Sequence, residues 1–136
     1  MNLKNKTITT GFIIAGLMNS SVLIFSRFFT NTTIPEFDAQ VMSNFGLLMI
    51  FIWGLAYISV SKKYKNVKYL IAIFSIEKFI YGSVWINWIF NNSISDVFEK
   101  DVMAGIFYSI YGINDWLFFL FFTYVFIGLI KNKNSA

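Results

Sequence analysis

Two adjacent opposite charges, Glu77 and Lys78, lie inside a stretch that is otherwise apolar enough to cross a membrane. A charged side chain at the centre of a spanning helix costs roughly 2.5–3.5 kcal/mol on insertion scales. Inserting the pair into a membrane therefore costs about 5–7 kcal/mol of free energy. Insertion of the apolar neighbours in the same segment is favourable by a similar amount. We expect this segment to insert only with partner helices and to turn both charges toward protein or water.

Glu77 and Lys78 are consecutive, so in a helix their side chains point about 100° apart and are poorly placed to satisfy each other. We predict that Lys78 pairs with Asp115. Glu77 is then expected to bond to Asn19 or Arg27. A rise of about 1.5 Å per residue puts Asn19, Glu77 and Lys78 at similar depths and Asp115 somewhat further out, so these side chains can meet.

Polar and aromatic residues that share helix faces with these charges form the predicted ligand-binding set. They are Asn19, Arg27, Asn44, Glu77, Lys78, Tyr81, Trp85, Tyr108, Tyr111 and Asp115. Aromatic walls around a carboxylate suit a small amphipathic or cationic molecule, through cation–π contacts and a counter-charge. A purely structural interpretation is equally open, because a Lys–Asp bridge inside a bundle often serves only packing specificity.

The composition excludes several kinds of site. The 136 residues include no cysteine and no histidine, which removes disulfides, thiol nucleophiles, imidazole bases and nearly every zinc or copper site. We therefore expect no metal and no cofactor. With 57% hydrophobic and 13% charged residues, the chain is too apolar for a soluble domain of its size. We expect one transmembrane domain, residues 1–136, whose fold consists of the membrane-spanning segments packed together.

The apolar segments predict an all-α fold, an integral membrane four-helix bundle. The expected spans are 8–29, 39–60, 69–90 and 102–130, with a short interfacial helix before the last. Asp38 is expected to cap the second span, and Gly16 and Ser20 have the spacing that lets two helices approach closely. Aromatic residues near the span ends are expected in interfacial belts; they are Trp53, Tyr57, Tyr69, Trp88 and Tyr124.

The charges in the connecting segments predict the orientation. The leader, the turn 61–68 and the tail carry only basic charges, namely Lys4, Lys6, Lys62, Lys63, Lys65, Lys68, Lys131 and Lys133. The other two connections are mainly acidic, with Glu36, Asp38, Asp96, Glu99 and Asp101. The positive-inside rule then puts both termini in the cytoplasm, and we expect a bacterial cytoplasmic (inner) membrane. These lysines are expected to meet the lipid bilayer rather than nucleic acid.

The four spans share one pattern, with polar residues from the midplane outward and phenylalanines from the midplane inward. This pattern predicts an outward-facing polar and aromatic vestibule that binds or transports a small amphipathic or cationic molecule. A membrane enzyme with Glu77 or Asp115 as acid or base is an alternative, although no nucleophile motif or cofactor fingerprint is present. An accessory subunit of a membrane complex is another, marked by an exposed glycine seam formed by Gly11, Gly46, Gly54 or Gly105.

Overall fold

The computed structural model describes residues 4–134, and these contain helices and connections but no strand. The all-α prediction is confirmed. The helices are α1 (Asn5–Ser20), α2 (Val22–Phe25), α3 (Thr33–Phe37), α4 (Asn44–Val60), α5 (Lys68–Asn91), α6 (Ile94–Lys100) and α7 (Val102–Asn134), with a 3-10 turn, η1 (Tyr64–Asn66), between α4 and α5. Helix α6 is the short helix expected before the last span.

Three helical segments are long and apolar enough to cross a membrane. They are Asn5–Phe25 with 21 residues, Lys68–Asn91 with 24 and Val102–Lys131 with 30. Helix α4 is also apolar but has 17 residues. Because a hydrocarbon core of about 30 Å takes roughly 20 helical residues to cross, these lengths suggest a membrane protein.

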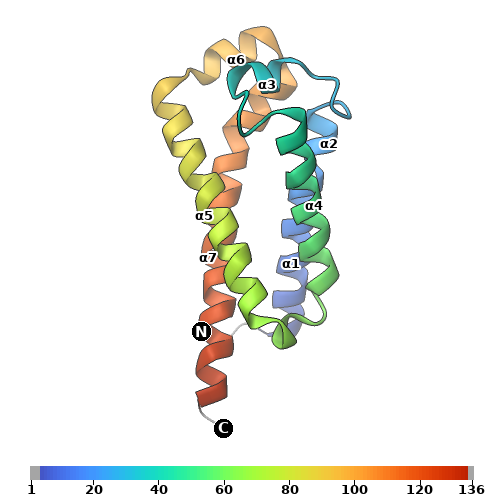
Figure 1. The fold of residues 1–136 in the computed structure, drawn as a ribbon, viewed down its shortest axis with the longest axis vertical. Coiled ribbons are helices and arrows are strands. Elements are labelled where there is room, and N and C mark those ends of the chain that lie inside the picture. Colours follow the sequence, from blue (N-terminus) through green and yellow to red (C-terminus); the bar gives the residue numbers. More distant parts are fainter. Residues whose placement is uncertain (1–3, 135–136) are drawn as a thin grey trace.

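The long helices form two pairs. Helix α1 packs along α4, and α5 packs along α7, whereas contacts between the pairs are fewer (Figure 1). Helices α3 and α6 lie together across one end of the bundle, which we call the capped end. The opposite end carries the connection 61–67 with Lys62 and Lys63, and we call it the lysine end.

Each half of the bundle has its own core. The half near the lysine end is filled by aromatic rings, including Phe12, Phe74 and Phe122, as the inward phenylalanine pattern predicts. An apolar core also lies in the half near the capped end, where the sequence predicts a polar and aromatic vestibule. Helices α3 and α6 fold over this end and contribute the buried side chains of Ile34 and Val97 to that core.

The contact between α1 and α4 depends on two glycines. A Cβ atom added to Gly54 would lie 2.8 Å from the carbonyl oxygen of Gly16, 2.8 Å from the Cβ of Asn19 and 3.3 Å from the amide nitrogen of Ser20. The close approach predicted from Gly16 and Ser20 is therefore confirmed. It brings Asn19 against the backbone of α4.

The first helix ends earlier than the sequence predicts. It ends at Phe25 rather than at residue 29, because Arg27, Phe28 and Phe29 have φ angles of 48°, 55° and 67°. This left-handed conformation costs non-glycine residues roughly 1–2 kcal/mol each. The side-chain amide of Asn44 holds the turn by donating to the carbonyl of Phe29 at 3.1 Å.

The second long helix begins later than predicted. It starts at Asn44, and the hydroxyl of Ser43 accepts a hydrogen bond from the Gly46 amide at 3.1 Å. The expectation that Asp38 caps this helix is wrong. Its carboxylate instead accepts from the amide of Val41 at 2.9 Å and closes a separate turn.

Asp101 links the left-handed turn at residues 27–29 to the start of α7. Its carboxylate forms an ion pair with Arg27 at 2.8 Å and accepts from the Asn31 side chain at 3.0 Å and from the Ala104 amide at 2.8 Å. Burial acts to raise the pKa of the Asp101 carboxyl, but these donors outweigh it, and the pKa lies below its usual value. A second ion pair, between Lys100 and Glu36, joins α6 to α3.

We expect Gly54→Ala to destabilise the protein by about 1–3 kcal/mol, because the new methyl group forces α1 away from α4. Thermal unfolding in detergent measures the effect. The matched control is Gly128→Ala, whose methyl group meets nothing within 4 Å. Equal unfolding temperatures for the two variants would show that the close approach of α1 and α4 is not needed for stability.

Candidate functional site

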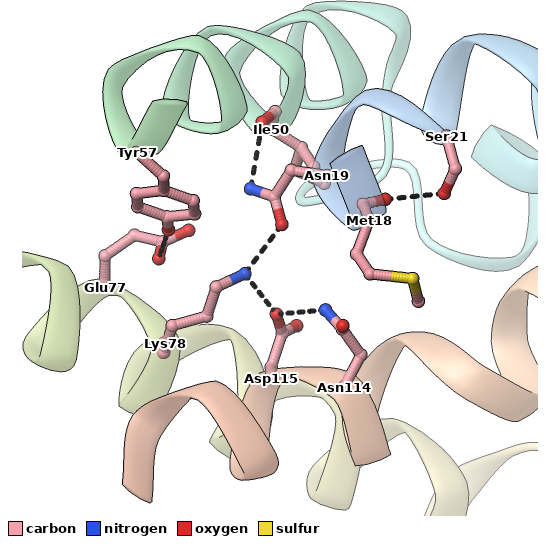
Figure 2. Close-up of polar contacts among 9 residues, drawn as sticks. All are labelled: Met18, Asn19, Ser21, Ile50, Tyr57, Glu77, Lys78, Asn114 and Asp115. Atoms are coloured by element: carbon pink, nitrogen blue, oxygen red, sulfur yellow. Dashed lines mark hydrogen bonds and ion pairs between the residues drawn. The ribbon is translucent and has the colours of Figure 1, made fainter. Parts of the chain in front are cut away.

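An ion pair buried between the two helix pairs forms the centre of the candidate site. Lys78 Nζ on α5 lies 2.6 Å from Asp115 Oδ1 on α7 and 2.8 Å from Asn19 Oδ1 on α1 (Figure 2). The Lys78 residue is 1% exposed. Asn19 is held in turn by α4, since its Nδ2 donates to the carbonyl of Ile50 at 3.0 Å. The predicted Lys78–Asp115 pair is confirmed, and it connects all four long helices.

Glu77 points away from this pair, toward α4. One carboxylate oxygen, Oε2, accepts a hydrogen bond from the hydroxyl of Tyr57 (Figure 2). The prediction that Glu77 bonds to Asn19 or Arg27 is wrong. Lys78 takes the side-chain oxygen of Asn19, and Arg27 pairs with Asp101 at the capped end.

Tyr57 is the main residue of the site that the sequence interpretation missed. It was expected in an interfacial belt, but it is fully buried, with its ring 5.3 Å from Lys78 Nζ. Its position three residues after Gly54 was the available signal, because that spacing puts both residues on the α4 face that turns inward. Trp88 was also expected in a belt, but it is 4% exposed and stacks on Tyr108 at 4.2 Å between ring centroids.

A cavity of about 30 Å³ adjoins the ion pair, which is room for one or two water molecules. Of the predicted site residues, those that line it are Asn19, Glu77, Lys78, Tyr81, Tyr111 and Asp115. Side chains outside the predicted ligand-binding set complete the wall, among them Met18, Ser21, Ile50 and Asn114. The cavity therefore contains groups from α1, α4, α5 and α7.

The other four predicted site residues lie away from the cavity and have structural contacts. Arg27 and Asn44 hold the left-handed turn near the capped end. The Trp85 indole donates to the carbonyl of Tyr108 at 2.8 Å, and its ring covers Gly112. The Tyr108 hydroxyl donates to the carbonyl of Ile34 at 2.7 Å and so secures α3.

Two polar atoms beside the cavity have no hydrogen-bond partner among the described residues. They are Oε1 of Glu77 and the hydroxyl oxygen of Tyr111, and both are buried. Within residues 4–134 Glu77 also forms no ion pair. Lys78 and Asp115 cancel each other's charge, so an ionised Glu77 leaves one uncompensated negative charge in this interior. A buried charge of that kind calls for a proton or a cation.

We expect Lys78→Met to destabilise the protein by about 3–5 kcal/mol, because it leaves the carboxylate of Asp115 buried and alone. Thermal unfolding in detergent measures the loss. The double variant Lys78→Met, Asp115→Leu removes both charges and should recover most of it, which a double-mutant cycle quantifies. Additive effects of the two substitutions would show that the ion pair contributes no coupling.

No family model, curated protein or solved structure matches this chain. A role for the cavity residues therefore has to come from their own geometry. The most informative features are a satisfied ion pair and, next to it, a carboxylate with one free oxygen.

Proposed function

We propose that this protein is a four-helix membrane protein that binds a small monovalent cation at Glu77, in the cavity between its two helix pairs. The observation that carries the proposal is the free Oε1 of Glu77, buried beside the cavity without a hydrogen-bond partner in the described residues. Lys78 does not neutralise it, because Asp115 and Asn19 already hold the ammonium group.

The size of the cavity narrows the choice of ligand. A volume of about 30 Å³ suits a cation near the size of water, such as ammonium, a dehydrated alkali-metal ion or a protonated water. A larger amphipathic molecule needs a pocket of several hundred Å³. The free hydroxyl of Tyr111 offers a second oxygen to such a cation, and the rings of Tyr81 and Phe107 contribute to the cavity wall.

The packing of α4 supports a fourth crossing of the membrane. Its 17 residues give a length of about 25 Å, at the short end of the range for spanning helices. Because α4 runs antiparallel to α1 and packs along it (Figure 1), a membrane that contains α1 surrounds α4 as well. The distribution of lysines supports placing the lysine end in the cytoplasm of a bacterial cell, with the protein in the inner membrane.

The alternative role as an assembly subunit receives less support. The glycines of the expected seam each face the chain itself: an added Cβ would meet Phe121 at Gly11, the Val41 carbonyl at Gly46, Gly16 at Gly54 and Phe98 at Gly105. These positions serve internal packing, so they leave no glycine seam there for a second protein.

The topology can be tested with single cysteines, because the natural chain has none. Gln40→Cys and Lys63→Cys place exposed thiols at opposite ends of α4. In intact cells we expect a membrane-impermeant maleimide to label Gln40→Cys and to label Lys63→Cys only after permeabilisation. Labelling of both thiols from the same side would show that α4 does not cross the membrane.

Cation binding can be tested by titrating the purified protein with ammonium, methylammonium, sodium and potassium, using calorimetry and thermal shift. We expect one cation to bind the wild type, more weakly at low pH because protons compete for the same carboxylate. Glu77→Gln should weaken binding at least tenfold and remove the pH dependence. Glu99→Gln is the matched control, since it removes an exposed carboxylate at the capped end. Equal binding by Glu77→Gln and the wild type would refute the proposal.

A further inference from the structure

A groove of about 520 Å³ runs along the outer surface of the bundle between α1 and α7, in the half near the lysine end. These helices belong to different pairs. The groove shares no lining residue with the cavity at Glu77. Its ligand is therefore a separate question from the proposed cation.

The groove is apolar along most of its length and polar at one end. Gly11, Phe118 and Phe121 line it along its length, and the half-exposed side chains of Ile14 and Leu117 form its edges. Gly11 leaves room for the ring of Phe121, which an added Cβ would contact at 2.6 Å at its Cε2. From Lys6 to Ile14 the groove follows α1 for about 12 Å, a length that fits within one leaflet of a bilayer.

Exposed groups with unused bonding capacity lie at the polar end. Lys6, Thr7 and Thr10 line it and are exposed. In the part of the chain that the structure describes, Lys6 has no ion pair, and neither threonine hydroxyl has a hydrogen-bond partner. The chain has no acidic residue before Glu36, none from 61 to 68 and none after Asp115. The polar end is therefore positively charged, with two hydroxyl donors beside the charge.

We propose that this groove binds one anionic phospholipid of the leaflet at the lysine end. Its phosphate lies against Lys6 and the two threonine hydroxyls, and one acyl chain lies along Gly11, Phe118 and Phe121. An ammonium group with hydroxyl donors matches a phosphate, and an adjoining apolar groove matches a hydrocarbon chain. A lysine near an anionic surface contributes enough attraction to favour an anionic over a zwitterionic headgroup about fivefold.

Native mass spectrometry of the purified protein with phosphatidylglycerol or phosphatidylcholine of identical chains tests the headgroup. We expect one phosphatidylglycerol to be retained in preference to phosphatidylcholine. Lys6→Gln should lower this preference about fivefold. The matched control is Lys62→Gln, which removes an exposed charge at the same end but outside the groove. Equal loss in both variants would indicate diffuse attraction to the lysine end and would overturn the proposal.

A second pair of variants tests the groove itself. Ile14→Trp places a large ring in the groove and should reduce lipid retention, whereas Ile24→Trp adds the same ring on exposed helix surface nearer the capped end. Both sites are exposed, so both variants should fold, and unfolding temperatures check this. Unchanged retention in Ile14→Trp would place the lipid elsewhere and would also overturn the proposal.

Discussion

The arrangement of the four long helices depends on the position of one ammonium group. Lys78 reaches from α5 to Asp115 on α7 and to Asn19 on α1, and Asn19 is bonded in turn to α4. A second polar link between the two pairs is the hydrogen bond from Tyr57 on α4 to Glu77 on α5. In a low-dielectric interior this ion pair is strongly directional, because any other register leaves a charge without a partner. Its main effect is therefore to select one way of joining the pairs.

Because Lys78 pairs with Asp115, the neighbouring carboxylate of Glu77 has no ion-pair partner among the described residues. Glu77 lies next to Lys78 in sequence, but the helix turns it about 100° away, toward Tyr57 and the small cavity. A bundle that needed only stability would satisfy both oxygens or replace the carboxylate by an apolar side chain. The free oxygen of Glu77 beside the cavity is the observation on which the proposed cation site rests.

The capped end stabilises the bundle in a different way. There the chain adopts a left-handed turn at Arg27, Phe28 and Phe29, and the carboxylate of Asp101 collects donors from Arg27, Asn31 and the start of α7. Two side chains of the core at this end bond to the backbone of α3. The Tyr108 hydroxyl donates to the carbonyl of Ile34, and the Trp88 indole donates to the carbonyl of Phe37. Tyr108, which belongs to the predicted ligand-binding set, thus bonds to the backbone of α3, because α3 lies across this end of the bundle.

The sequence by itself determined the helical class, a composition too apolar for a soluble domain and the aromatic core near the lysine end, because each follows from composition or from the spacing of residues within one helix. The Lys78–Asp115 pair was predictable from the depths of two charges on different helices, which the rise per residue gives. It also showed that Glu77 and Lys78 must have different partners. Only the tertiary structure decided that Tyr57 is the partner of Glu77, that Arg27 bonds to Asp101, and that the polar space is a cavity for one or two waters. Those outcomes depend on which helices pair and on how α3 and α6 close one end, and neither can be read from the period of a single helix.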